Sequence, residues 1–239
     1  MSPNPPEGFE HELCVALFED RLHLAEDYVG LLSNEGIEWG LLGPRECDRL
    51  WDRHILNSLC VSPLIPQGSW VADIGSGAGL PGIALALSRP DLRIDLIEPM
   101  QRRVDFLELC IERLGLADSV RVLRLRAEEY QGGPPILTCR ALSSVSGLVR
   151  MLSPLLGHAV LLAIKGARAE VEITAADAEL TEHGLIAQIL RPLVYGYVVG
   201  TVVHVHTRTH EDKMDDRMKS RDVRKVHDDS VPCPENRAV

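Results

Sequence analysis

A glycine-rich turn that directly follows a short apolar run constrains the fold of this chain more than any other feature. Residues 70–74 are mostly apolar, and Gly75-Ser76-Gly77-Ala78-Gly79 comes next, before a stretch with helical periodicity over residues 80–88. Glycines at these positions let the main chain approach a ligand closely, because no Cβ atom intervenes. The order strand, glycine turn, helix therefore predicts a ligand-binding α/β unit.

The residues around this turn discriminate between nucleotide-like ligands. A dinucleotide fingerprint requires a third glycine where Leu80 stands, and a phosphate-binding loop for nucleoside triphosphates requires a lysine that is absent nearby. Asp73, just before the glycines, suits a ligand with an ammonium group and would repel a pyrophosphate. We therefore expect S-adenosylmethionine (SAM), bound at Asp73, Gly75 and Gly77. The alternative is that the glycines only form a tight turn and that Asp73 caps the next helix.

Glu98 is a second candidate cofactor ligand, because it follows the next apolar run. A carboxylate at the end of that strand can accept hydrogen bonds from both hydroxyls of a ribose. This contact fits SAM and nicotinamide dinucleotides equally, so Glu98 does not discriminate between them.

The chain from residue 67 to 207 alternates short apolar runs with helical segments, which is typical of a largely parallel sheet. The predicted strands cover residues 70–74, 93–97, 120–123, 136–139 and 159–164, and the predicted helices cover residues 80–88, 102–114, 145–156 and 169–183. Residues 201–207 alternate as a half-buried antiparallel strand does, and residues 185–194 are expected to pair with them. We predict a Rossmann-like α/β fold of the class I SAM-dependent methyltransferase type, with a mostly parallel seven-stranded sheet whose last strand is antiparallel.

The two ends of the chain differ from this central domain. Residues 8–33 show roughly helical spacing, and a second helix is expected from Gly43-Pro44 through Leu59, ending near Pro63 and Pro66. Residues 1–66 are thus predicted to form a helical cap. Residues 208–239 carry mixed charges and few large apolar side chains, so we expect a disordered tail.

The distribution of charge and cysteine limits the function classes. The net charge is −10, but the first 50 residues alone carry −8, which leaves the central region nearly neutral with local arginine clusters. Binding of nucleic acid is therefore permitted. The six cysteines are scattered without a paired motif, so neither a metal site nor disulfides are expected. No secretion signal or membrane span is predicted, and we expect a cytoplasmic protein.

Several motifs, taken together in order, resemble one enzyme family. They are Leu50-Trp51-Asp52-Arg53-His54-Ile55-Leu56-Asn57-Ser58, the run Asp73 to Gly82, Arg102-Arg103, Arg126-Ala127-Glu128-Glu129, Cys139-Arg140-Ala141 and Ile164-Lys165-Gly166. The resemblance covers about residues 20–207 and is to the RsmG (GidB) family, methyltransferases that modify N7 of a guanine in 16S ribosomal RNA. The chain departs from the family in having Cys139 where serine or threonine is frequent, and in a charge-balanced tail where many members are basic.

This resemblance implies roles for individual residues. It implies SAM contacts at Gly75, Leu80, Ala127, Glu128 and Arg140. The candidate contacts to the RNA substrate are Arg53, His54, Arg140 and Lys165. Other roles are open for these four: a surface ion pair for Arg140, solvation or helix capping for Arg53 and His54, and a neighbouring carboxylate as the partner of Lys165.

The chemistry implied by the resemblance needs no dedicated general base, because guanine N7 carries a free lone pair at neutral pH. Catalysis then consists of aligning the nucleophile with the methyl group, and the sequence does not identify a catalytic residue. Because the central region is nearly neutral, we expect the substrate to be 16S RNA within a small-subunit particle, and the enzyme to be a monomer. Two alternatives are a SAM-dependent methyltransferase of a small molecule, with the helical cap as a lid, and an inactive module that binds SAM or RNA.

Overall fold

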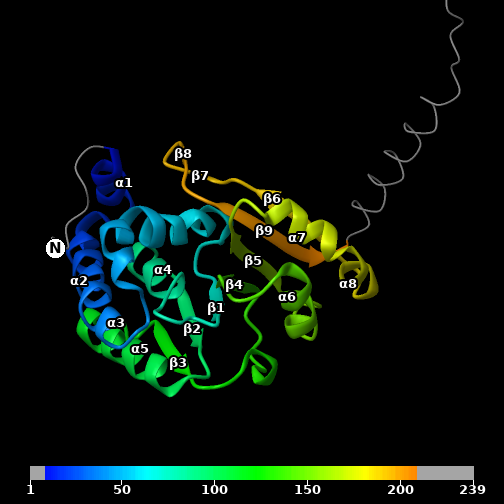
Figure 1. Ribbon diagram of the computed structural model, residues 1–239, viewed down its shortest axis with the longest axis horizontal. Coiled ribbons are helices and arrows are strands. Elements are labelled where there is room, and N and C mark those ends of the chain that lie inside the picture. Colours follow the sequence, from blue (N-terminus) through cyan, green and yellow to red (C-terminus); the bar gives the residue numbers. More distant parts are fainter. Residues whose placement is uncertain (1–8, 209–239) are drawn as a thin grey trace, which may run out of the picture. The chain divides into compact units, whose positions relative to one another are not determined.

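The computed structural model describes residues 9–208, so the predicted disordered tail lies almost entirely outside the described residues. A seven-stranded sheet forms the centre of this region (Figure 1). Its strands are β1 (Trp70–Ile74), β2 (Arg93–Ile97), β3 (Val120–Leu123), β4 (Ile136–Arg140), β5 (Val160–Lys165), β6 (Leu185–Leu190) and β9 (Thr201–Thr207). Their order is β3-β2-β1-β4-β5-β9-β6. β9 runs antiparallel to both of its neighbours, β5 and β6, and the other pairs of neighbouring strands are parallel. The predicted sheet is confirmed.

Side chains alternate between the two faces of the sheet along each strand, so both faces present apolar side chains. Helices cover both faces. Val71 and Leu96 point into a core shared with α1 (Phe9–Phe18), α2 (Leu22–Ser33), α4 (Gly82–Ser88) and α5 (Gln101–Leu114). Ala72 and Ile97 point into a second core shared with α6 (Val145–Leu152), α7 (Ala169–Ala175) and α8 (Asp177–Glu182). The predicted helical cap therefore shares its apolar core with one face of the sheet.

The longest helix shows how the sequence determines these elements. In α5, Val104, Leu107, Cys110 and Leu114 recur at spacings of three and four residues, and all four side chains are buried. Gly115 ends the helix in the left-handed conformation with φ of 66°, which glycine adopts without steric cost. The predicted and observed bounds of this helix differ by one residue.

The single helix predicted for residues 8–33 is wrong, because it is divided in the structure. α1 ends at Phe18, and a 3₁₀ turn (η1, Glu19–Arg21) precedes α2. Glu19 adopts a positive φ of 49°, which interrupts the helical backbone. Apolar spacing continues across this break, so periodicity alone did not reveal it.

The second predicted helix of the cap is helical but not a regular α-helix. It begins with a 3₁₀ segment (η2, Pro44–Arg49), continues as a π-helix (η3, Leu50–Leu56) and ends in another 3₁₀ segment (η4, Leu59–Leu64). The wider winding of a π-helix alters the pattern of carbonyl bonding, and such segments occur frequently at functional sites. This π-helix carries Arg53 and His54.

Prolines account for two further differences. α6 ends at Leu152 instead of residue 156, because Pro154 has no N–H with which to continue the helical hydrogen bonds. β6 ends at Leu190, and Pro192 separates it from a short hairpin of β7 (Leu193–Val194) and β8 (Tyr197–Val198). The expected pairing with β9 is present only over β6.

Two helix predictions were too long. The helix expected from residue 80 begins at Gly82, after Pro81, and the helix expected over residues 169–183 is divided into α7 and α8. Within residues 9–208, no helix combines the length and the apolar character needed to cross a membrane.

The strand order reverses between β1 and β4, because the chain continues from β1 to one side of the sheet and from β4 to the other. In open α/β sheets, ligands bind outside the carboxyl ends of the strands at this reversal. The turn after β1 begins with Gly75, and Arg140 is the last residue of β4. The fold therefore places two of the predicted site segments side by side.

A buried tyrosine connects the helical cap to the glycine turn. The hydroxyl of Tyr28 on α2 donates a 2.7 Å hydrogen bond to the carbonyl oxygen of Ala78. We predict that Tyr28→Phe lowers the free energy of unfolding by about 1–3 kcal/mol, because a buried carbonyl loses its partner. Urea unfolding measures this change. The exposed Tyr195 provides the control, since Tyr195→Phe should change stability by less than about 0.5 kcal/mol, and equal effects of the two variants would contradict the assignment.

Candidate active site

The glycine turn after β1 requires glycine for two distinct reasons. Gly75 and Gly77 have φ values of 70° and 60°, in the left-handed region that other residues rarely adopt. A Cβ atom on Gly75 would also lie 2.6 Å from the Leu142 Cδ1 atom, whereas one on Gly77 would meet nothing closer than 3.9 Å. Gly77 therefore leaves open space beside the main chain.

That open space belongs to a cavity of about 300 Å³, which we call the glycine cavity. Its lining residues come from the cap, the glycine turn, α5 and the segment after β4: Leu41, Leu42, Gly75, Ser76, Gly77, Ala78, Leu80, Arg103, Arg140, Ala141 and Leu142. Four of the residues predicted to bind SAM are therefore found at one cavity: Gly75, Gly77, Leu80 and Arg140.

Asp73 lies beneath the turn and not in the cavity. Its side chain is fully buried, and Oδ2 accepts a hydrogen bond of 3.0 Å from the Gly82 N–H at the start of α4. Oδ1 has no hydrogen-bond partner among the described residues. Burial raises the pKa of this carboxyl to about 7, although the Gly82 bond opposes the rise. The bond to the following helix, considered from the sequence as the alternative role, is thus present in the structure, and the contact of Asp73 with an ammonium group stays a prediction.

Glu98 is likewise engaged by the protein. Its carboxylate accepts backbone hydrogen bonds of 3.0 Å from Gly77 and from Met100, and the Arg103 guanidinium lies 3.5 Å away. The side chain is almost completely buried. Glu98 therefore fixes the glycine turn directly, and a ribose hydroxyl would have to share or displace one of these bonds.

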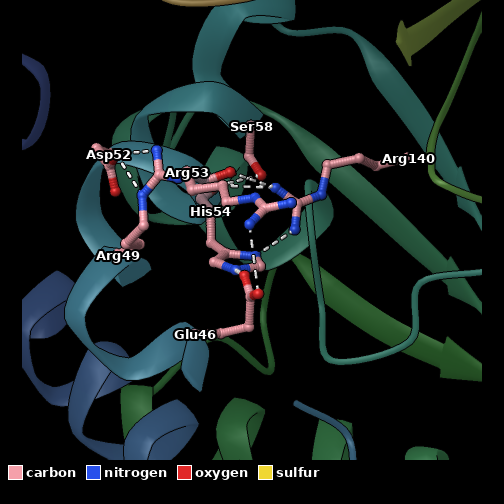
Figure 2. A network of polar contacts seen from close by, with 7 residues as sticks. All are labelled: Glu46, Arg49, Asp52, Arg53, His54, Ser58 and Arg140. Carbon is pink, nitrogen blue, oxygen red and sulfur yellow. Dashed lines mark hydrogen bonds and ion pairs between the residues drawn. The ribbon is translucent and has the colours of Figure 1, made fainter. Parts of the chain in front are cut away.

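Arg140 joins the end of β4 to the π-helix of the cap (Figure 2). Its Nη1 donates to the backbone carbonyls of Arg53 at 2.9 Å and of His54 at 3.4 Å, and its Nη2 lies 2.5 Å from His54 Nδ1. The surface ion pair considered for this residue is not what the structure contains. Arg140 bonds instead to carbonyls and an imidazole, and burial lowers the pKa of its guanidinium.

His54 is placed between this arginine and a carboxylate. Its Nε2 lies 2.8 Å from the Glu46 Oε2 atom, and its side chain is nearly buried. Burial lowers the pKa of the imidazole below its ordinary value of 6.5, and the positive charge of Arg140 lowers it further, whereas the bond to Glu46 raises it. The neutral ring is therefore the form present near pH 7.

A second and larger cavity, of about 960 Å³, opens next to the glycine cavity. We call it the basic cavity, because Arg49, Arg53, Arg140, Lys165 and Arg168 line it against the three acids Glu46, Asp52 and Glu172. The two cavities share three lining residues, the continuous segment Arg140, Ala141 and Leu142. This segment therefore borders both cavities.

Lys165 lines the basic cavity, but its ammonium group is occupied. It lies 2.8 Å from the Glu172 carboxylate and donates a short hydrogen bond to the Ser143 carbonyl. The neighbouring carboxylate, considered from the sequence as the alternative to a phosphate, is the partner that the structure contains. The exposed cations at this cavity are instead Arg49, Arg53 and Arg168.

Ala127 and Glu128 follow β3 in a 3₁₀ turn (η5, Ala127–Glu129) and do not line either cavity. Glu128 is exposed, and Ala127 packs against the second core. Their predicted contact with an adenine edge stays a prediction.

Sequence reasoning missed several lining residues. Leu41 and Leu42 close the glycine cavity from a loop of the cap, and Glu46 holds His54 from eight positions earlier in the chain. No motif marks these residues: Leu41 and Leu42 reach the cavity only when the cap packs on the sheet, and a spacing of eight residues between Glu46 in η2 and His54 in η3 is no recognised pattern. Arg103 stood in a motif noted for resemblance, but its place at Glu98 was not anticipated.

Comparison with known proteins gives a consistent family match. The family model described as rRNA small subunit methyltransferase G (GidB) matches residues 21–196. A protein named ribosomal RNA small subunit methyltransferase G from Renibacterium salmoninarum is 51% identical over 172 residues, which cover 71% of this chain and 80% of the relative. The protein of the same name from Mycolicibacterium smegmatis is 51% identical over 168 residues, covering 68% and 71%.

Solved structures resemble the chain at the level of the fold. The mitomycin 7-O-methyltransferase MmcR aligns with a TM-score of 0.53 and 16% identity, over 84% of this chain and 69% of its own. A mutant of MtNAS aligns with a TM-score of 0.52 and 21% identity, over 83% and 78%. These similarities support the Rossmann-like architecture.

The buried Asp73 generates a prediction about pH. Because burial raises its pKa from 3.8 to about 7, the folded chain holds this proton more tightly than the unfolded chain does. The stability that Asp73 contributes is thus present below about pH 4 and is lost as the pH rises toward 7. We predict that Asp73→Asn, which cannot ionise, becomes more stable relative to wild type by a few kcal/mol across this window.

Chemical unfolding at a series of pH values between 4 and 8 measures the difference. The exposed Asp118 provides a matched control, since Asp118→Asn should follow the wild-type curve. A difference between Asp73→Asn and wild type that stays constant across this pH range would show that Asp73 is not protonated in the folded protein.

Proposed function

Because the chain belongs to the rRNA small subunit methyltransferase G (GidB) family, we propose that it transfers a methyl group from SAM to N7 of a guanine in 16S ribosomal RNA. The observation that supports this function is that the two cavities share the lining residues Arg140, Ala141 and Leu142. A methyl donor in the glycine cavity and a base in the basic cavity would meet there. The enzyme would thereby hold both reactants in contact, which is the main requirement for methyl transfer to a free lone pair.

The residues of the glycine cavity fit SAM. Gly75 and Gly77 both have positive φ values, and the missing Cβ atom at Gly77 leaves the backbone there open to close approach. Leu41, Leu42 and Leu80 add an apolar wall, which suits an adenosyl group. When bound, SAM supplies a methyl group on a positively charged sulfur, which a lone pair can displace.

The chain's own residues then have to orient the base and keep its lone pair accessible. Guanine N7 needs no proton removed, so neither His54 nor Glu46 is required as a base. His54 is bonded to Arg140 and Glu46, and the Glu172 carboxylate is bonded to Lys165. The polar groups of the basic cavity are therefore fixed before substrate arrives, which lowers the cost of ordering them during the reaction.

The charge of the basic cavity fits an anionic substrate. Five arginine and lysine side chains against three carboxylates give this lining a net positive charge, in a chain whose net charge is −10. Exposed Arg53 and Arg168 are placed to contact phosphates, which position RNA without reading its sequence. Such a small basic area is expected to bind free RNA weakly.

We therefore take the substrate to be 16S RNA within a small-subunit particle, where other surfaces contribute to binding. One chain contains both cavities, so a monomer suffices for the reaction. Since the proposed substrate is a ribosomal particle, the enzyme acts in the cytoplasm.

Methylation assays with labelled SAM test this function. Purified protein is given either protein-free 16S RNA or small-subunit particles from cells that lack the enzyme, and the modified nucleoside is identified and mapped by mass spectrometry. We expect N7-methylguanosine at one position, with particles methylated at least about tenfold faster than free RNA. Label only in small metabolites would contradict RNA as the substrate. Equal rates on both RNA substrates would contradict the small-subunit particle as the preferred substrate.

A matched pair of glycine variants tests the cofactor site. Gly77 and Gly115 both have a φ in the left-handed region and both have room for a Cβ atom, but only Gly77 lines the glycine cavity. Each change to alanine should cost about 1–2 kcal/mol of stability through backbone strain. We predict that only Gly77→Ala weakens SAM binding, by about tenfold or more, because its methyl group enters the cavity.

Calorimetric titration with SAM, together with urea unfolding, separates the two effects. If Gly77→Ala binds SAM as tightly as Gly115→Ala does, the cofactor does not occupy the glycine cavity.

A further inference from the structure

The guanidinium of Arg140 is held by three acceptors that all belong to one short segment of the cap. Two are the carbonyl oxygens of Arg53 and His54 in the π-helix, and the third is the Nδ1 atom of His54 (Figure 2). The backbone carbonyl oxygen of His54 also accepts a 2.5 Å hydrogen bond from the Ser58 hydroxyl. The orientation of Arg140 therefore depends on how the cap presents His54.

The protonation of His54 follows from its two neighbours. Arginine has only N–H donors, so the ring atom facing Arg140 must be an acceptor, which means that Nδ1 carries no proton. The proton of the neutral ring is then on Nε2, which donates to the Glu46 carboxylate. Glu46 thus selects the tautomer whose other nitrogen can accept from Arg140.

We propose that Glu46 and His54 are positioning residues that hold Arg140 at the boundary of the two cavities, and that methyl transfer requires an unprotonated His54 Nδ1. This inference rests on the proposed function, because it assigns a role at the same site. Neither residue contacts the reacting groups in this proposal. Both act through Arg140, which lines both cavities.

The packing explains why Arg140 needs this support. Its guanidinium is removed from solvent enough to lower its pKa, so each N–H without an acceptor is costly. The side chain is also long and flexible, and fixing it in one orientation costs conformational entropy. Three acceptors on one rigid segment compensate for both costs and select a single orientation.

Acid would disturb this arrangement. The charged and titratable groups that face the ring are Glu46 from η2, Arg53 from its own π-helix and Arg140 from β4. When the pH falls through the pKa of His54, a proton on Nδ1 removes the acceptor and places a second positive charge beside Arg140. The arrangement is intact above this pKa and is lost below it, and burial sets the pKa lower than 6.5.

Two substitutions of His54 separate the roles of its nitrogens. The amide of asparagine reaches about as far as Nδ1, so His54→Asn can keep an acceptor for Arg140 while losing the bond to Glu46. The amide of glutamine reaches about as far as Nε2, so His54→Gln keeps the bond to Glu46 and loses the acceptor. We expect His54→Gln to lower kcat by about 100-fold, and His54→Asn to lower it by no more than about tenfold.

The dependence of kcat on pH provides a readout that a merely structural role would not change. Wild type should lose activity in acid, and His54→Asn should lack this loss because asparagine does not titrate. In Glu46→Gln the acid loss should move to lower pH, because the carboxylate that raises the His54 pKa is gone. His23→Gln, a change of an exposed histidine on α2, should leave the wild-type profile unchanged.

A measurement without substrate or cofactor tests the tautomer itself. In two-bond ¹H–¹⁵N spectra of the full-length protein at pH 7.5, His54 should show a protonated Nε2 and an unprotonated Nδ1. Because this measurement uses the wild-type protein, it tests the proposal even where circular dichroism shows that a variant does not fold. A protonated Nδ1 in the folded wild type would overturn the proposal.

The kinetic outcomes are equally decisive. Equal activity of His54→Gln and His54→Asn, or an acid loss that persists unchanged in His54→Asn, would overturn the positioning role. If the wild-type protein methylates no small-subunit RNA, the proposed function fails instead, while the tautomer measurement still decides the geometry. Wild-type methylation with a normal rate for His54→Gln would contradict only the present inference.

Discussion

The hydrogen bonds from Arg140 to the π-helix of the cap are the contacts on which the arrangement of the site depends. They connect the last residue of β4 to a segment that precedes it in the chain by more than 80 residues. Because the same arginine lines both cavities, these bonds fix the boundary between them relative to the cap. A cap that was merely packed on the sheet by apolar contacts would allow that boundary to shift.

Buried carboxylates give the glycine turn its shape from below. Glu98 accepts the Gly77 N–H, and Asp73 accepts the Gly82 N–H, so each acid satisfies a backbone donor that the turn leaves without a ladder partner. Burying a carboxyl group costs free energy at Asp73: its other oxygen has no partner among the described residues, and burial raises its pKa. Asp73 and Glu98, predicted from the sequence as cofactor ligands, thus shape the main chain in this structure, and their contacts with SAM stay predictions.

Much of the fold could be predicted because apolar periodicity is a local signal. Apart from β6, which ends four residues early, the predicted strands and α5 agree with the observed ranges to within a residue or two, and the antiparallel β9 follows from alternation in Thr201–Thr207. The failures arise where local backbone chemistry overrides periodicity, as at Glu19, Pro154 and Pro192. The π-helix was predicted as a regular helix, because both windings bury similar positions and periodicity does not distinguish them.

The site was predictable where the glycine turn indicates a ligand by itself, as at Gly75 and Gly77, and where the family resemblance implied a contact, as at Leu80 and Arg140. Gly75, Gly77, Leu80 and Arg140 meet at one cavity, as expected. The partners of Lys165 and His54 were not predictable, because Glu172 and Glu46 reach them from separate elements with no recognisable spacing. Lys165 bonds to the Glu172 carboxylate in this structure, and its contact with a phosphate of the RNA stays a prediction.

In the proposed site, the two cavities hold methyl donor and base on opposite sides of Arg140–Leu142. A crystal structure with S-adenosylhomocysteine, the demethylated cofactor, tests this arrangement. We expect the ligand in the glycine cavity, with the homocysteine sulfur facing the Arg140 segment and the basic cavity beyond it. A ligand bound elsewhere, or a sulfur that faces away from this segment, would contradict it.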